Sequence, residues 1–191
     1  MEELKRRILA QAENLGHGIL KVDGFISHQI DTHLMLRIGK AIASRFEDAG
    51  LTKVVTAEIS GIAPALATGY ALDIPVIYAR KVRTATMTGP VYVEASSTPV
   101  ARNSGDAFLM ISAEYLGPDD RALIVDDFLA SGSTIEALVR LVNHAGATLV
   151  GIGTIIEKQF EGGREELSRY NVPIVSLAVI TDMSDGKIVV E

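Results

Sequence analysis

The segment from residue 122 to residue 134 holds the densest group of side chains suited to binding a charged ligand. A short apolar run ends in Asp126 and Asp127, and a loop of small residues then leads into a predicted helix. Gly132 permits a tight turn, small residues let backbone amides approach a ligand, and the helix start adds positive partial charge. The loop is therefore predicted to hold a phosphate through Ala130, Ser131, Gly132, Ser133 and Thr134.

The paired acids need a different role, because two carboxylates would repel a phosphate. Vicinal hydroxyls or a metal ion would suit them, so a sugar phosphate satisfies the whole segment. The alternative is structural: Asp126 is then a buried acid, and Ser131 or Ser133 merely caps the helix. A Walker phosphate loop is excluded, because its Gly-Lys-Ser/Thr is missing.

The elements that position this segment read as alternating strands and helices. Two amphipathic helices open the chain, one around Leu4 and Ile8 and one from Leu34 to Phe46. Strands are predicted over 54–57, 76–79, 122–125, 148–156, 174–179 and 188–190, with helices over 61–72, 135–142 and 164–170. This order predicts an α/β fold, a mostly parallel central sheet flanked by helices, with ligands at the carboxyl ends of the strands.

Residues 81–117 interrupt the alternation and are rich in Thr, Ser, Gly and Pro. The runs 91–93 and 108–111 are predicted to pair as the stem of a flexible hairpin lid with its tip at 96–105. Such a lid would keep water from an activated intermediate. An ordinary flexible insertion is the alternative.

Composition excludes several classes of partner. Eighteen Lys and Arg against 24 Asp and Glu give a net charge of −6, so nucleic acid is not an expected partner. The most apolar long window, 59–79, contains Pro64, Asp73 and Pro75, so no membrane span is expected. The chain has no cysteine, which fits a cytoplasmic protein, and its four histidines show no metal-ligand spacing.

The segment 122–134 resembles the phosphoribosyl pyrophosphate signature of type I phosphoribosyltransferases. Segments 20–31, 60–64, 78–81 and 151–158 are similar to the bacterial xanthine phosphoribosyltransferases. The resemblance implies a single domain over 1–191, with residues 1–35 as an N-terminal hood over the base pocket. It also implies a purine salvage enzyme that transfers 5-phosphoribosyl from phosphoribosyl pyrophosphate to xanthine, needs Mg²⁺ and forms a homodimer.

Several site roles follow from that resemblance. The loop from Glu58 to Gly61 is expected to face the pyrophosphate, with amides of Ser60 and Gly61 directed at it and a cis peptide bond, not involving proline, at Glu58–Ile59. Arg80 and Lys81 supply cations, while Asp126 and Asp127 hold the ribose hydroxyls. Mg²⁺ is expected to bind mainly through substrate and water, with the two acids as its available protein ligands.

The base contacts implied by the resemblance are Leu20, Ser27, Phe128 and Lys158. Lys158 can donate to a purine oxygen, which rejects adenine because its amino group is itself a donor. The family usually has Asn where this chain has Ser27, so the choice between xanthine and guanine stays open. A relative that prefers guanine or hypoxanthine is one alternative, and a non-catalytic regulator that binds phosphoribosyl pyrophosphate is another.

Overall fold

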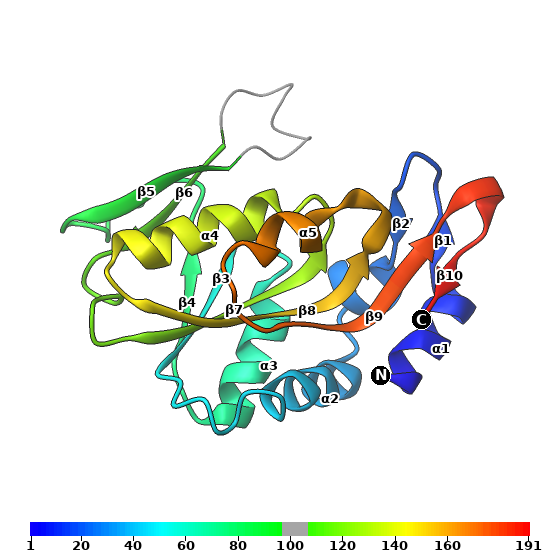
Figure 1. Ribbon diagram of the computed structural model, residues 1–191, viewed down its shortest axis with the longest axis horizontal. Helices are drawn as coiled ribbons and strands as arrows, with labels where there is room; N and C mark the ends of the chain where they lie inside the picture. The colour runs from blue at the N-terminus through cyan, green and yellow to red at the C-terminus, as the bar shows by residue number, and fades with distance from the viewer. Residues whose placement is uncertain (97–106) are drawn as a thin grey trace.

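The computed structural model describes residues 1–96 and 107–191 and is built on a six-stranded sheet (Figure 1). The strands lie in the order β10 (Val189–Val190), β9 (Ile174–Asp182), β8 (Thr148–Lys158), β7 (Arg121–Leu129), β3 (Lys53–Ala57) and β4 (Val76–Ala79). Neighbouring strands are parallel except β10, which pairs antiparallel with β9. The predicted α/β fold with a mostly parallel sheet is confirmed.

Helices cover both faces of the sheet, because successive strand residues point to opposite sides. Val54 and Leu123 pack with α1 (Glu2–Gln11), α2 (Thr32–Ala43) and α3 (Ile62–Leu72). Their neighbours Val55 and Ile124 pack with α4 (Ser133–His144) and α5 (Gly163–Ser168). Figure 1 shows α4 and α5 on one side of the sheet and α2 and α3 on the other. Two buried cores thus pack against the two faces of the sheet.

A separate two-stranded hairpin forms from β5 (Val91–Ser96) and β6 (Ala107–Ser112). The predicted stem is confirmed, but Ser96 pairs with Ala107 and belongs to the stem, not the tip. The rest of the predicted tip, 97–105, lies outside the described residues. Arg80 and Met110 exchange backbone hydrogen bonds of 2.9 and 2.8 Å, which join the stem to the end of β4. The role of this hairpin as a lid stays a prediction.

The N-terminal segment contains structure that the sequence analysis did not predict. Strands β1 (Glu13–Asn14) and β2 (Leu20–Lys21) form a short hairpin, and a π-helix follows over Asp23–Ser27. The amide of Asn14 donates to two carbonyl oxygens near the end of β9, those of Met183 and Lys187, each at 2.8 Å. Short 3₁₀ turns at Gln159–Glu161 and Ser184–Gly186 follow β8 and β9.

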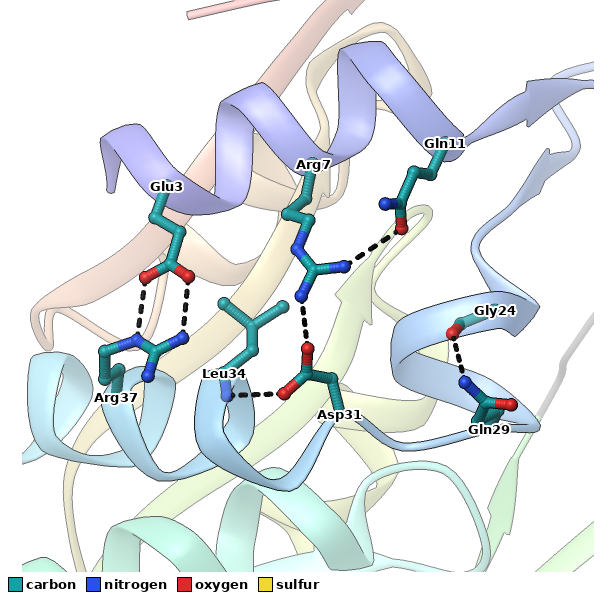
Figure 2. Close-up of polar contacts among 8 residues, drawn as sticks. All are labelled: Glu3, Arg7, Gln11, Gly24, Gln29, Asp31, Leu34 and Arg37. Atoms are coloured by element: carbon teal, nitrogen blue, oxygen red, sulfur yellow. Dashed lines mark hydrogen bonds and ion pairs between the residues drawn. The ribbon is translucent and has the colours of Figure 1, made fainter.

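Ion pairs join α1 to α2, which follows the π-helix (Figure 2). Arg37 donates two hydrogen bonds to Glu3, of 2.7 and 2.6 Å, and Arg7 pairs with Asp31. Asp31 also accepts the backbone N–H of Leu34 at 3.0 Å and so caps α2. The π-helix is therefore held between a hairpin anchored to β9 and a helix anchored to α1.

No helix among the residues described is both long and apolar enough to cross a bilayer.

Candidate functional site

The loop between β7 and α4 has the predicted strand-loop-helix form. Gly132 has a φ of 82°, occupies the N-cap of α4 and accepts the N–H of Glu136 at 2.8 Å. Because no side chain caps this helix, the alternative in which Ser131 or Ser133 acts as the cap is wrong. The hydroxyls of these serines lie 3.4 Å apart at the mouth of the loop. A helix start with half-buried Ala130, Ser131, Ser133 and Thr134 around it is suited to an anion.

Asp126 and Asp127 lie at the carboxyl end of β7 and are 6% and 8% exposed. Asp126 accepts the N–H of Asp127, and Asp127 accepts the N–H of Phe128, each at 3.0 Å. Burial, followed by the neighbouring Asp127 carboxylate, raises the pKa of Asp126 well above its usual range, and the charge of Lys81 opposes that rise. A ligand that supplies hydroxyl donors or positive charge would stabilise the charged form of such a carboxyl.

The loop between β3 and α3 lies directly against these acids. Its Glu58–Ile59 peptide bond is cis, as expected. A Cβ on Gly61, the N-cap of α3, would lie 2.3 Å from Thr56 Oγ1 and 2.7 Å from Asp126 Oδ1. Only glycine therefore fits there, and the loop with exposed Ser60 meets Asp126 at the carboxyl end of β7.

The cations predicted after β4 are tied to the same loop through Glu58. Its Oε1 accepts the backbone N–H of Lys81 at 2.7 Å, and its Oε2 lies 3.9 Å from Arg80 Nε. Within residues 1–96 and 107–191, Arg80 Nε and Thr56 Oγ1 are the buried side-chain polar atoms with no hydrogen-bond partner. Buried polar atoms normally have partners. Two such atoms beside one loop fit a site that receives a polar ligand.

The predicted base contacts are only partly brought together. Lys158 Nζ lies 5.5 Å from the centre of the Phe128 ring and donates to the Gly18 carbonyl at 2.7 Å and to Glu161 at 3.1 Å. An ammonium has three donors, so one remains for a ligand acceptor. Leu20 is buried in the core on which Phe128 packs.

Ser27 is not hydrogen-bonded to this group in the described chain. It is exposed at the end of the π-helix.

Two contacts at the site were missed by the sequence analysis. Gly18 follows Gly16 and His17, and all three have left-handed φ values of 81°, 51° and 74° in chain order. This Gly-His-Gly turn is the sequence signal for the hairpin that brings the Gly18 carbonyl to Lys158. Gly163 donates its N–H to the Ala130 carbonyl at 3.1 Å, and the Gly162-Gly163 pair is the signal for that close approach.

Comparison with solved structures shows the fold. The chain superposes on the adenine phosphoribosyltransferase of Rhodothermus marinus with a TM-score of 0.75 and 26% identity, covering 94% of this chain and 97% of that one. For the adenine phosphoribosyltransferase of Thermoanaerobacter pseudethanolicus the TM-score is 0.73 at 22% identity, with 93% and 98% covered.

Comparison of sequences gives the family. The phosphoribosyl transferase domain model matches residues 28–183. The chain is 48% identical over 187 residues to the xanthine phosphoribosyltransferase of Deinococcus deserti, covering 97% of this chain and 95% of that protein. It is 44% identical over 188 residues to that of Bacillus licheniformis, with 98% and 96% covered. Because the domain model spans most of the chain and these relatives match it almost end to end, the chain belongs to the phosphoribosyltransferase family and, within it, to the xanthine phosphoribosyltransferases.

Proposed function

We propose that this chain transfers the 5-phosphoribosyl group of phosphoribosyl pyrophosphate to xanthine, giving xanthosine 5′-monophosphate and pyrophosphate. One observation carries the proposal: three adjacent parallel strands deliver complementary groups to one end of the sheet. Strand β3 leads into the loop 58–61, β4 into Arg80 and Lys81, and β7 into Asp126, Asp127 and the loop 130–134. Relatives named as xanthine phosphoribosyltransferases support the choice of base.

In this reaction the bond between ribose C1 and pyrophosphate breaks while a purine nitrogen forms a bond to C1. Positive charge develops on the ribose ring and negative charge on the leaving group. The chain is proposed to act by alignment and by stabilising that charge. The loop 130–134 holds the 5′-phosphate, Asp126 and Asp127 hold the ribose hydroxyls, and the loop 58–61 with Arg80 and Lys81 receives the pyrophosphate.

Mg²⁺ is the proposed cofactor, and the side chains present fit only a loosely ligated ion. No group of three or more His, Cys, Asp or Glu side chains within the described residues could hold a metal. Mg²⁺ keeps several waters and binds one or two carboxylates together with phosphate oxygens. Asp126 and Asp127 are the carboxylates available to it. When bound it would neutralise charge on the pyrophosphate.

The proposed base site explains a preference for oxopurines. The third donor of Lys158 can reach a purine oxygen, while Phe128 offers a ring face beside it. The Gly18 carbonyl and Glu161 fix the ammonium in place. Guanine and hypoxanthine also carry an oxygen, so an enzyme that prefers guanine or hypoxanthine is the second candidate, and Ser27 in place of the family's usual Asn leaves that choice open.

The cytoplasm is the proposed compartment.

A second copy of the chain is the proposed partner. Leu66 and Tyr70 lie one turn apart on α3 and are 61% and 80% exposed. Large exposed apolar side chains that line a common hollow are typical of association surfaces. Sedimentation analysis of wild type and of a Leu66→Lys/Tyr70→Lys variant tests this: the wild type is expected to be a dimer and the variant a monomer.

The proposed function is tested by supplying phosphoribosyl pyrophosphate and Mg²⁺ with xanthine, guanine, hypoxanthine or adenine in turn. Nucleotide and pyrophosphate are measured together. Xanthine is expected to give the highest kcat/KM and adenine no turnover. A higher kcat/KM with guanine or hypoxanthine would establish the second candidate instead. Binding of phosphoribosyl pyrophosphate without turnover of any base would contradict enzymatic function and point to a regulator.

A further inference from the structure

An ion pair between a buried glutamate and a partly exposed arginine lies beside the proposed phosphate loop but outside every predicted site. Glu157, near the end of β8, is 1% exposed. Arg164 donates to both of its carboxylate oxygens, from Nε at 2.8 Å and from Nη2, and Ser176 Oγ donates at 2.6 Å. Although burial raises the pKa of Glu157, these hydrogen bonds outweigh it and the pKa is lowered. Burying the Glu157 charge offsets much of what its pairing with the 37% exposed Arg164 side chain contributes, so the value of the pair lies in the geometry it fixes.

The guanidinium of Arg164 joins two strands to the start of α5. Besides Glu157 on β8, it donates to the Ile174 carbonyl and to Ser176 Oγ on β9, each at 3.1 Å. These hydrogen bonds hold the guanidinium against both strands. Arg164 immediately follows Gly163, the first residue of α5, so the pair also determines where Gly163 lies.

Gly163 is in close contact with the loop that follows β7. Its N–H donates to the Ala130 carbonyl, and a Cβ at this position would lie 2.2 Å from that carbonyl oxygen and 2.7 Å from Gly132 N. A Cβ on Gly132 would in turn lie 3.2 Å from the Gly163 carbonyl oxygen. Packed backbone segments cannot shift independently, so displacement of Gly163 would displace residues 130–132.

We infer that Glu157 and Arg164 are positioning residues: they hold Gly163 against residues 130–132 and thereby set the affinity of the chain for a 5′-phosphate. This inference rests on the proposed function of the loop 130–134. It predicts a selective effect, because pyrophosphate is expected to bind at the separate loop 58–61.

The test uses isothermal titration with two probes, ribose 5-phosphate and inorganic pyrophosphate. The double variant Glu157→Leu/Arg164→Met removes both charges together, so no unpaired charge stays buried and folding is retained. Its Kd for ribose 5-phosphate is expected to rise about tenfold, while its Kd for pyrophosphate stays within about twofold of wild type. Arg169→Met is the matched control, because it removes an exposed arginine paired with Glu136 and should change neither Kd.

A second variant reaches the loop directly and does not depend on the ion pair. Gly163→Ala places a methyl group against the Ala130 carbonyl and should weaken ribose 5-phosphate binding on the order of a hundredfold. Gly117→Ala is its control, since nothing lies within 4 Å of a Cβ there.

The outcomes separate this inference from the proposed function. A folded double variant with wild-type affinity for ribose 5-phosphate would overturn the inference alone. Equal weakening of both probes would also overturn it, because that result indicates a general structural role. A wild-type protein that binds pyrophosphate but not ribose 5-phosphate would overturn the proposed phosphate loop itself.

Discussion

The two halves of the proposed active site are built in different ways. The phosphoribosyl region, residues 58–61, 80–81, 126–127 and 130–134, follows three adjacent strands whose buried cores fix them from both sides. The base region, residues 18–27, 128 and 158, is assembled from distant segments, and its hydrogen bond from Lys158 to Gly18 spans 140 positions. The proposed charge-stabilising groups thus follow neighbouring strands of the sheet, whereas the proposed base contacts combine residues of β7 and β8 with an N-terminal segment that buries Leu20, Phe25 and Ile26 in the core.

The largest expected effect is on the acids of the phosphoribosyl region. Asp126→Asn and Asp127→Asn should each lower kcat/KM for phosphoribosyl pyrophosphate, because each removes charge-assisted hydrogen bonds to the ribose. The expected loss of transition-state stabilisation is about 1.5–3 kcal/mol for each variant. Steady-state kinetics measure this, with exposed Asp119→Asn as the control. Wild-type catalysis in both variants would remove these acids from the site, and a fall in melting temperature alone would make them structural.

Asp126→Asn should also change how stability depends on pH. An acid whose pKa is raised by folding holds its proton more tightly in the folded state, so stability falls as pH rises from the ordinary carboxylate range through the raised pKa. Asparagine does not ionise, so the variant does not lose stability in this way as the pH rises. Without ligand, the variant should therefore have a higher melting temperature than wild type at neutral pH. Below the pH range in which ordinary carboxylates titrate, the two melting temperatures should be equal. A constant difference across all pH values would contradict the raised pKa.

Lys158→Met tests whether the base region acts separately. Loss of a charged donor should weaken the binding free energy of every oxopurine by about 1.5–3 kcal/mol and raise its KM accordingly. The KM for phosphoribosyl pyrophosphate should change little. The experiment compares both KM values in the same variant, with Lys187→Met as an exposed control. If the two KM values rise together, the two regions are not independent.

Matched glycine substitutions compare the rigidity of the two regions. Gly61→Ala forces a methyl group against Thr56 and Asp126 and should lower the free energy of unfolding by about 1–3 kcal/mol. Gly24→Ala, in the π-helix of the base region, meets nothing within 4 Å and should be nearly neutral. Chemical denaturation measures both. Equal losses would show that the base region is as tightly packed as the phosphoribosyl region.

The smallest effect is expected at position 27. Ser27→Asn restores the amide usual in the family and should raise preference for xanthine over guanine by about 0.5–1.5 kcal/mol, the value of one hydrogen bond. The ratio of the two kcat/KM values reports it. An unchanged ratio would mean that this position, exposed in the structure, does not contact the base.

The same contrast explains what could be predicted from sequence. The apolar run, two acids and small-residue loop at 122–134 form one continuous string, so local patterns and the rules of parallel sheets locate it. The roles of 58–61 and 80–81 follow from the family resemblance. The contacts of Lys158 with Gly18 and of Gly163 with Ala130 depend on tertiary packing: the glycine pairs signal a tight turn and a close approach, but no local pattern names the partner. The hairpin at 13–21 was missed because its strands are only two residues long and have no alternation to detect.

A crystal structure of the chain with xanthosine 5′-monophosphate bound would test the division of the site most directly. The 5′-phosphate is expected on residues 130–134, the ribose hydroxyls on Asp126 and Asp127, and the base beside Phe128 with an oxygen on Lys158 Nζ. A nucleotide bound with its phosphate on the loop 58–61, or with its base away from Phe128 and Lys158, would contradict this division of the site.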